Sequence, residues 1–238
     1  MNLVILEPGE SGDGSDTRLS GARATHLLDV LRVRPGAQVR VGILDGPRGV
    51  GTVTSIDALA RMLTLRCTFE PELPPRPAVD LLLALPRPKV LRRLWAQLSA
   101  MGVGQIILTN AERVERNYFD THILSPEYYQ PLLIEGLQQA RDTWLPRVSV
   151  HRQFKVLVED DLDALFGSGR RLVADPSGKE PPRGSSSERM LLAVGPEGSW
   201  NDFELRLLEA HGFRRVGMGA RTLRTDTACI ALLALLAT

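Results

Sequence analysis

Residues 191–227 read LLAVGPEGSWNDFELRLLEAHGFRRVGMGARTLRTDT, and this stretch predicts an α/β fold. It begins with four apolar residues that run into the turn GPEG at 195–198, as in a buried strand that ends at a ligand-binding loop. Asn201 and Glu204 then have the spacing of a capping box, which predicts that a helix starts there. A second short strand follows the helix and enters the turn GMG at 217–219.

The glycine turns predict a site that binds a small ligand through the main chain. The glycines of GPEG and GMG allow the backbone to approach a ligand closely, and helix N-termini add unpaired N–H groups. The turn DPSG at 175–178 follows another predicted strand and is a third candidate loop. On spacing alone, ordinary strand-to-helix connections explain these turns equally well.

Taken together, the motifs resemble the signature of a known enzyme family. GPEG at 195–198 and MGARTLRTDTA at 218–228 are similar to the paired motifs GPEGG and LG-x-RILR-x-ETA of the 16S ribosomal RNA uridine-N3 methyltransferases, the small-subunit methyltransferase E family of the SPOUT superfamily. The segment 26–36, with its HL, VLR and PG, is similar to the N-terminal pattern HL-x-x-VLR-x-x-x-G of that family. The resemblance therefore spans nearly the whole chain.

The resemblance implies an enzyme that uses S-adenosyl-L-methionine to methylate the N3 atom of a specific uridine in 16S ribosomal RNA. The cofactor would lie bent among the glycine loops. The residues that would bind it are Leu172, Gly195, Pro196, Glu197, Gly198, Met218, Gly219, Leu223, Arg224, Thr225 and Thr227.

Methyl transfer from a sulfonium is a direct displacement, so the enzyme must align the uracil N3 with the methyl group and remove the N3 proton. Arg221 and Arg224 are the candidate catalytic residues, because a guanidinium can stabilise the negative charge that develops on the uracil. Glu197 or Asp226 could act as the base, but each is equally typical of a helix cap or an ion-pair partner. The base therefore has no assignment from the sequence.

The chain is expected to fold as two domains. Residues 1–72 contain three alternating segments between 39 and 69 and form a small β-rich barrel, which by resemblance is a PUA-like RNA-binding domain. Residues 78–238 form an α/β domain with a SPOUT-type parallel sheet, in which the resemblance implies a C-terminal trefoil knot. Between them, the four prolines of EPELPPRP at 70–77 predict a stiff extended linker.

The final predicted helix, 228–237, is apolar nearly all round. Such a helix must be buried on every side, which in a chain of 238 residues suggests a subunit interface. The family is known for dimers, so the resemblance implies a homodimer formed through the SPOUT domain.

Six residues are candidates for contacts with RNA: Arg18, Arg23, His26, Arg32, Arg113 and Arg141. The first four cluster around a predicted helix in the N-terminal domain, although a charge-rich helix is more often a solvated face. From sequence alone, surface ion pairing explains Arg113 and Arg141 equally well, and His26 is more typical of a packed or capping histidine than of a base. The implied partner is ribosomal RNA or the small ribosomal subunit.

Five positions depart from the family's pattern: Gln97, Ala100, Leu137, Ser199 and Asp226. Gln97 and Ala100 replace a Lys and a Glu. Joint loss of an ion pair would be nearly neutral, whereas loss of two RNA contacts would change the substrate. Two alternatives therefore stay open, namely the same chemistry at a different RNA site and a non-catalytic RNA-binding paralogue. The retained GPEG and LRTDTA motifs argue against the paralogue.

Composition limits the other possibilities. The formal net charge is +1, so contact with RNA must come from local patches and not from a global field. Cys67 and Cys229 have no partner spacing and the four histidines have no ligand spacing, so neither a disulfide nor a metal site is predicted. The N-terminus lacks the pattern of a signal peptide, and no apolar run reaches the ~20 residues of a membrane span, so we expect a cytoplasmic protein.

Overall fold

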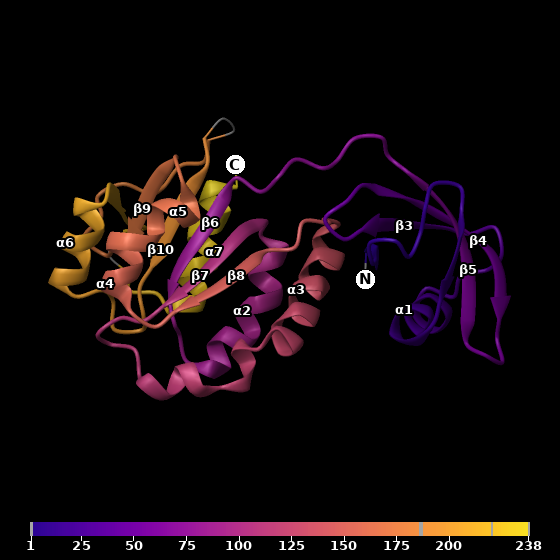
Figure 1. The fold of residues 1–238 in the computed structure, drawn as a ribbon, viewed down its shortest axis with the longest axis horizontal. Coiled ribbons are helices and arrows are strands. Elements are labelled where there is room, and N and C mark those ends of the chain that lie inside the picture. Colours follow the sequence, from indigo (N-terminus) through magenta and orange to yellow (C-terminus); the bar gives the residue numbers. More distant parts are fainter. Residues whose placement is uncertain (1, 186–187, 220, 238) are drawn as a thin grey trace. The chain divides into compact units, whose positions relative to one another are not determined.

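The computed structural model describes residues 2–185, 188–219 and 221–237, which form two compact units (Figure 1). The first unit comprises Met1–Arg76 and Ile134–Leu145, and the second comprises Pro77–Leu133 and Pro146–Thr238. The long helix α3, Pro126–Ala140, therefore contributes its first half to the second unit and its second half to the first.

The first unit is built on a five-stranded sheet with the strand order β1-β3-β4-β5-β2. The strands are β1 Val4–Leu6, β2 Asp16–Leu19, β3 Gln38–Ile43, β4 Arg48–Asp57 and β5 Met62–Phe69. A helix, α1 Gly21–Thr25, continues as a π-helical segment, His26–Val30. In the described residues β1 and β2 do not pair with each other, so the sheet is open and its closure into a barrel stays a prediction.

Alternation along β5 builds the core of this unit. Leu63, Leu65 and Cys67 are at most 2% exposed, whereas Arg66 between the last two is exposed. The three buried side chains pack in one cluster with Leu27 from the helical segment. The predicted strand over 63–69, with one apolar face, is therefore confirmed.

The second unit is built on a six-stranded sheet with the order β11-β9-β10-β6-β7-β8, in which every pairing is parallel. The strands are β6 Val79–Ala84, β7 Val103–Thr109, β8 Arg147–His151, β9 Arg170–Ala174, β10 Met190–Val194 and β11 Phe213–Val216. The helices besides α3 are α2 Pro88–Ala100, α4 Phe154–Val156, α5 Leu162–Phe166, α6 Asp202–Ala210 and α7 Thr225–Leu236. Short 3-10 helices cover Arg116–Asp120 and His122–Leu124, and a π-helical segment, Leu157–Asp161, joins α4 to α5. The predicted α/β class with a parallel sheet is confirmed.

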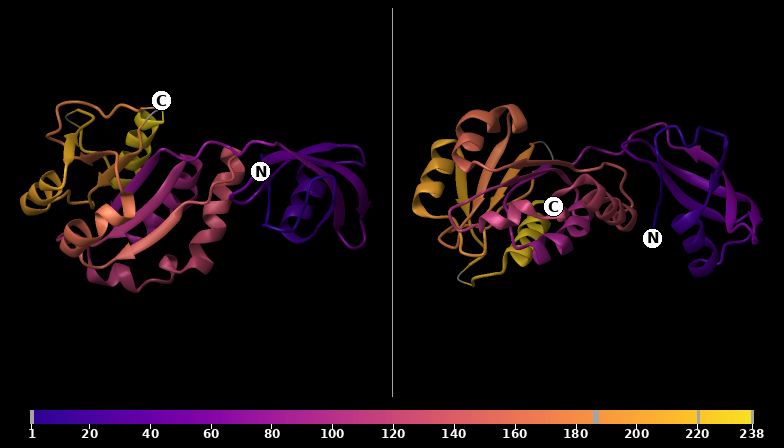
Figure 2. Two further views of the ribbon diagram at one scale, coloured as in Figure 1. Left: turned by 45° about the horizontal axis from the view of Figure 1, so that its top comes forward. Right: turned by 60° about the horizontal axis from the view of Figure 1, so that its bottom comes forward.

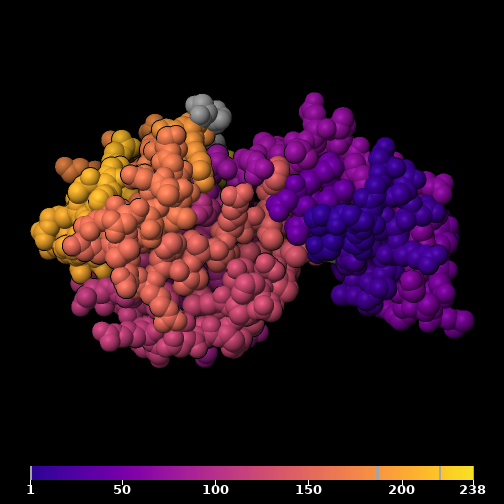
Figure 3. All heavy atoms as spheres, in the orientation of Figure 1, coloured from indigo at the N-terminus to yellow at the C-terminus, as the bar shows by residue number. Residues whose placement is uncertain are grey.

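Helices cover both faces of this sheet. Figures 1 and 2 show α2, α7 and the first half of α3 on one face and α4, α5 and α6 on the other. Helices α2 and α3 contact each other through the rings of Trp95 and Tyr129, whose centroids are 4.9 Å apart. Ser99 of α2 also donates a hydrogen bond to the Leu133 carbonyl of α3. In the space-filling view, the orange atoms of the region that holds α4 and α5 lie on the visible face of this unit (Figure 3). Because both faces are covered, β6 and β10 are buried throughout.

Helix α7 begins at Thr225, before the predicted start at residue 228. Asp226 and Thr227 consequently lie in its first turn and not in the loop that precedes it. One stripe of the helix is buried, including Cys229, where burial raises the pKa of the thiol to about 12. Leu235 on another stripe is 39% exposed, so this chain alone does not bury the helix on every side. No helix in the described ranges is long and apolar enough to cross a membrane.

Candidate functional site

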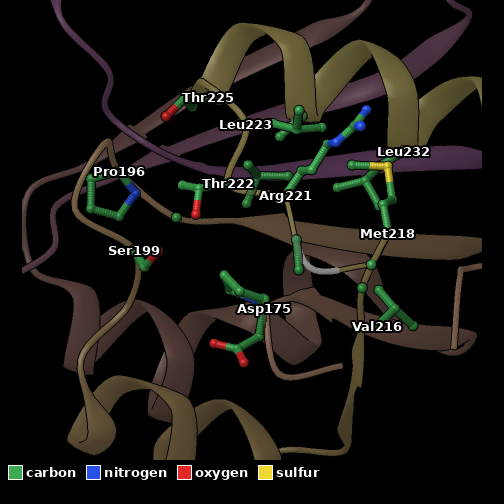
Figure 4. A pocket seen from close by; sticks show the side chains of 17 residues that line it. Asp175, Pro196, Ser199, Val216, Met218, Arg221, Thr222, Leu223, Thr225 and Leu232 are labelled. Atoms are coloured by element: carbon green, nitrogen blue, oxygen red, sulfur yellow. The ribbon is translucent and has the colours of Figure 1, made fainter. Parts of the chain in front are cut away.

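Three loops meet in one pocket at the carboxyl ends of β9, β10 and β11. The last residues of these strands, Ala174, Val194 and Val216, all line it, and the space between its walls and across its open mouth is about 610 Å³. The remaining lining residues are Asp175, Pro176, Gly195, Pro196, Ser199, Gly217, Met218, Gly219, Arg221, Thr222, Leu223, Thr225, Ala228 and Leu232. The carboxyl edge of a parallel sheet is where α/β proteins bind ligands. In Figure 4, Pro196 and Ser199 lie on one side of the pocket and Met218 and Leu232 on the other.

The loop after β9 and the loop after β11 are in direct contact through their main chains, at Gly178 and Gly217. A Cβ added at Gly178 or at Gly217 would lie well inside 3.0 Å of backbone atoms of the other loop. The contact is reinforced by the N–H of Asp175, which donates to the Val216 carbonyl at 3.0 Å, and by the N–H of Gly217, which donates to the Glu180 carbonyl at 2.9 Å. Only glycine permits this approach, so these residues set the shape of the pocket floor.

The GPEG loop is held from outside the pocket. Glu197 accepts a hydrogen bond from the N–H of Arg87, the N-cap residue of α2, at 3.1 Å. The guanidinium of Arg113 donates to the carbonyl of Gly198 and, at 3.5 Å, to that of Ser199. Ser199 has φ of +63°, a left-handed conformation that favours glycine. Glycine, which the family has at this position, would therefore fit this backbone conformation better than serine does.

The predicted capping box at the start of α6 is confirmed. Asn201 accepts from the N–H of Glu204 at 2.8 Å, and Glu204 accepts from the N–H of Asn201 at 2.8 Å. The other carboxylate oxygen of Glu204 accepts from the N–H of Glu112 at 2.7 Å. Glu204 is 3% exposed and fully engaged, so its role is to join the GPEG segment to the loop after β7.

Asp226 is held by an ion pair. Its carboxylate accepts from Arg93 of α2 at 2.7 Å and from the N–H of Thr227 at 3.0 Å. Burial alone would raise the pKa of Asp226, but these hydrogen bonds outweigh burial and hold that pKa below its usual value. Both carboxylates that the sequence offers as candidate bases therefore have partners within the chain. Asp226 pairs with Arg93, and Glu197 accepts a hydrogen bond at the start of α2.

The pocket gathers some of the predicted cofactor residues and not others. Those that line it are Gly195, Pro196, Met218, Gly219, Leu223 and Thr225, together with the predicted catalytic residue Arg221. Those outside the lining are Leu172, Glu197, Gly198, Arg224 and Thr227. Leu172 is fully buried within β9, and Arg224 is the exposed N-cap residue of α7. Ala220, in the loop between β11 and α7, lies outside the described residues.

Several lining residues were not predicted individually. Asp175 and Pro176 belong to the third candidate loop, whose position after a strand was the available signal. Ala228 and Leu232 come from α7, and their apolar pattern gave no sign that one side of the helix faces a pocket.

The predicted RNA-binding residues have varied surroundings. Arg23 forms a bidentate pair with Glu10 at 2.6 and 2.8 Å and donates to the Ile5 carbonyl, and the hydrogen bond from Arg23 lowers the pKa of Glu10. The Nε2 atom of His26 is buried without a partner in the described part of the chain. Arg18, Arg32 and Arg141 are exposed in the first unit.

The fold and the pocket at its carboxyl edge agree with the class of protein that the sequence comparison gives. Residues 73–237 match a family model described as an RNA methyltransferase domain. The chain is 32% identical to ribosomal RNA small subunit methyltransferase E of Treponema pallidum, with 97% of this chain and 88% of that protein covered. It is 30% identical to the protein of the same name from Synechocystis, covering 97% of this chain and 75% of the relative. The chain belongs to the ribosomal RNA small subunit methyltransferase E family, as its motifs predict.

A solved structure shares the fold. It is a ribosomal RNA small subunit methyltransferase E from Neisseria gonorrhoeae bound to S-adenosyl methionine, with a TM-score of 0.74 at 21% sequence identity. The match covers 98% of this chain and 95% of that one.

Proposed function

We propose that this protein transfers the methyl group of S-adenosyl-L-methionine to the N3 atom of a uridine in 16S ribosomal RNA. The observation that carries the proposal is the pocket formed by three glycine-containing loops at the ends of β9, β10 and β11, in a chain of this family. The Neisseria relative, which has the same fold, is described as bound to this cofactor. RNA as the substrate class agrees with the RNA methyltransferase match over 73–237.

The lining of the pocket suits the chemistry of this cofactor. Leu223 and Leu232 provide an apolar wall for a flat heterocycle, and the main chain of Gly195 and Gly217 provides close backbone contacts. When bound, the cofactor would supply an electrophilic methyl group on sulfur.

The chain's own contribution to the chemistry is orientation and charge. Arg221 lines the pocket and Arg224 stands exposed at the N-terminus of α7. Within the described residues neither guanidinium has a carboxylate partner, so both are available for a substrate. Either one stabilises negative charge on the uracil oxygens as the N3 proton leaves. Leu172, Glu197, Gly198 and Thr227 would then act by supporting the loops and not through the pocket wall.

The proposal includes the finer architecture that the family implies. A trefoil knot in the second unit is supported by the contacts of the segment before β10 with distant parts of the chain: Glu180 accepts from Gly217, and the N–H of Gly184 donates to the Leu235 carbonyl. A PUA-like barrel is supported by the five-stranded sheet of the first unit. A homodimer through the second unit is supported by the exposed stripe of α7, and a cytoplasmic location by the ribosomal RNA relatives.

Two measurements test the function. Calorimetry with S-adenosyl-L-methionine asks whether the purified protein binds the cofactor. Methylation of small ribosomal subunits from cells that lack the gene, with the methyl mapped by mass spectrometry, asks where the group goes. N3-methyluridine in 16S ribosomal RNA is the expected product. A methyl on another RNA would point to the second alternative, and absence of cofactor binding would leave a non-catalytic RNA-binding protein.

A further inference from the structure

A second cavity lies beside the GPEG segment, at the carboxyl end of β7. It encloses about 830 Å³, its mouth included, and none of the predicted site residues lines it. Asn110 and Glu112 follow directly after β7, Lys155 comes from α4, and Phe203 comes from the start of α6. The cavity is therefore built by three separate segments of the second unit and is not part of the pocket described above.

One side of this cavity carries positive charge. Arg116 is exposed, and its side chain has no hydrogen bond or ion pair with any other described residue. Lys155 has only a loose partner at 3.8 Å, the carboxylate of Glu159 in the π-helical segment that follows α4, and both side chains are exposed. Such cations are available to a phosphate group.

Another side carries an exposed ring. Phe203 is 51% exposed, although apolar aromatic side chains are usually buried. Phe154, which also lines the cavity, is 8% exposed and packs against Trp200 with ring centroids 5.3 Å apart. An exposed ring in a cavity that also carries basic side chains is an arrangement on which proteins stack single-stranded bases.

The lining of the cavity also offers a hydrogen-bond acceptor. The exposed carboxylate of Glu112 lines the cavity and has no partner among the described residues, whereas that of Glu204 is already occupied by backbone N–H groups. Nucleobases present N–H donors at their edges.

The walls of the two cavities approach each other at one place in the chain. Ser199 lines the first and Asn201 lines the second, with Trp200 buried at 4% exposure between them. Two residues of chain span at most ~7 Å. The stretch 199–201 therefore contributes to both linings, and Arg113 holds its start through the carbonyls of Gly198 and Ser199.

We propose that the second cavity holds an unmodified nucleotide of single-stranded RNA next to the uridine that enters the first pocket. Phe203 stacks on its base, the carboxylate of Glu112 accepts an N–H group of that base, and Arg116 and Lys155 contact its phosphate. The inference rests on the proposed function, because it assigns the neighbour of the methylated base. It makes the second cavity a recognition site and not a site of chemistry.

The test compares Phe203→Leu and Arg116→Gln with the control Arg206→Gln, which removes an exposed arginine of α6 outside the cavity. Steady-state methylation of deproteinised 16S ribosomal RNA and of assembled subunits gives KM and kcat, and calorimetry gives the affinity for S-adenosyl-L-methionine. Loss of one base stack is expected to raise KM for both RNA substrates about tenfold, with kcat and cofactor affinity unchanged. Fluorescence anisotropy with a labelled single-stranded RNA is expected to show the same loss of affinity.

Three outcomes would overturn the inference. The first is an unchanged KM in both variants while the wild type methylates RNA, which would leave the proposed function standing. The second is a parallel fall in cofactor affinity, which would make Phe203 and Arg116 structural supports of the GPEG segment. The third is a loss on assembled subunits alone, which would make the cavity a contact for ribosomal protein. A wild type that methylates no RNA would instead remove the proposed function itself.

Discussion

At the scale of single residues, several charged side chains of the motif region serve the protein's own structure. Glu197 caps the start of α2, Asp226 pairs with Arg93, and Arg113 holds the loop that carries Ser199. Arg221 and Arg224 differ from these, because no carboxylate engages them in the described chain. Among the charged residues that the sequence proposes for the chemistry, Arg221 and Arg224 are thus the ones without a carboxylate partner in the described residues.

Replacing Arg224 with Ala is expected to lower kcat for methyl transfer by about 100-fold, with the fold intact, because removal of one charge-stabilising donor costs about that much. Arg221→Ala is expected to act in the same direction. Turnover with radiolabelled cofactor and thermal unfolding together check this result, with Arg206→Ala as the control for loss of a surface charge. Near-wild-type turnover would remove the residue concerned from the mechanism.

The buried carboxylate of Asp80 predicts a pH dependence of stability. Asp80 in β6 is 1% exposed and lies 2.5 Å from the guanidinium of Arg189. Burial raises the pKa of Asp80, and Arg189 only partly offsets that rise. A carboxyl whose folded pKa exceeds its unfolded pKa binds protons more tightly in the native state. The stability it contributes is therefore full below the unfolded pKa and is lost as pH rises through the folded pKa.

Arg189→Leu is expected to enlarge the loss of stability that occurs as pH rises, because the carboxylate of Asp80 becomes more costly to ionise without its partner. The free energy of unfolding should fall by about 2 kcal/mol at pH 7 and by less at pH 4. The loss at pH 7 is smaller than for a fully buried ion pair, because the Arg189 side chain is 43% exposed. Urea unfolding at the two pH values measures the difference. An equal loss of unfolding free energy at pH 4 and pH 7 would show that Arg189→Leu does not change the pKa of Asp80.

At the scale of elements, the pocket depends on close contact between the loop after β9 and the end of β11. The glycines at 178 and 217 allow the two backbones to touch, and hydrogen bonds between main-chain groups fix the contact. The shape of the pocket is thus set by contacts between main-chain groups.

Gly217→Ala is expected to weaken binding of S-adenosyl-L-methionine at least tenfold, because the new Cβ would push the two loops apart. The matched control is Gly212→Ala. Gly212 has φ of +83° and open space around it, so Ala there should cost about 1 kcal/mol of stability and leave cofactor affinity unchanged. Calorimetry and thermal unfolding of both variants separate the two effects. Equal cofactor affinity in all three proteins would contradict the role of the loop contact.

At the scale of the whole molecule, predicted RNA contacts occur in both units. The pocket, both arginines and the predicted RNA contact Arg113 lie in the second unit, whereas Arg18, His26 and Arg32 lie in the first. A net charge of +1 gives no general attraction to RNA, so recognition must come from such local groups.

The homodimer is tested by Leu235→Glu, which places a charge on the exposed stripe of α7. This change should convert a dimer into a monomer, because burial of an unpaired carboxylate in an apolar interface is costly. Light scattering coupled to size exclusion measures the mass. Leu59→Glu is the control, since Leu59 is 99% exposed in the first unit. A monomeric wild type at micromolar concentration would rule out the proposed interface.

The sequence by itself determined the class of fold and the family. Apolar runs that end in glycine turns predict buried parallel strands, and the strands at 79–84 and 190–194 are buried at every position. The Asn201 and Glu204 spacing predicted a capping box, and the capping box is present. These features are local, because propensity, periodicity and capping act over a few residues. The strands β2 and β8 were not anticipated, since short half-exposed strands have weak patterns.

Only the tertiary structure decided which motif residues share the pocket. Glu197 and Asp226 are directed to partners 110 and 133 residues away in the chain, at Arg87 and Arg93, and no local rule gives those contacts. The second cavity likewise joins the ends of β7 and α4 to the start of α6. A motif fixes which residue types follow one another, but the direction of a side chain depends on what the fold brings beside it.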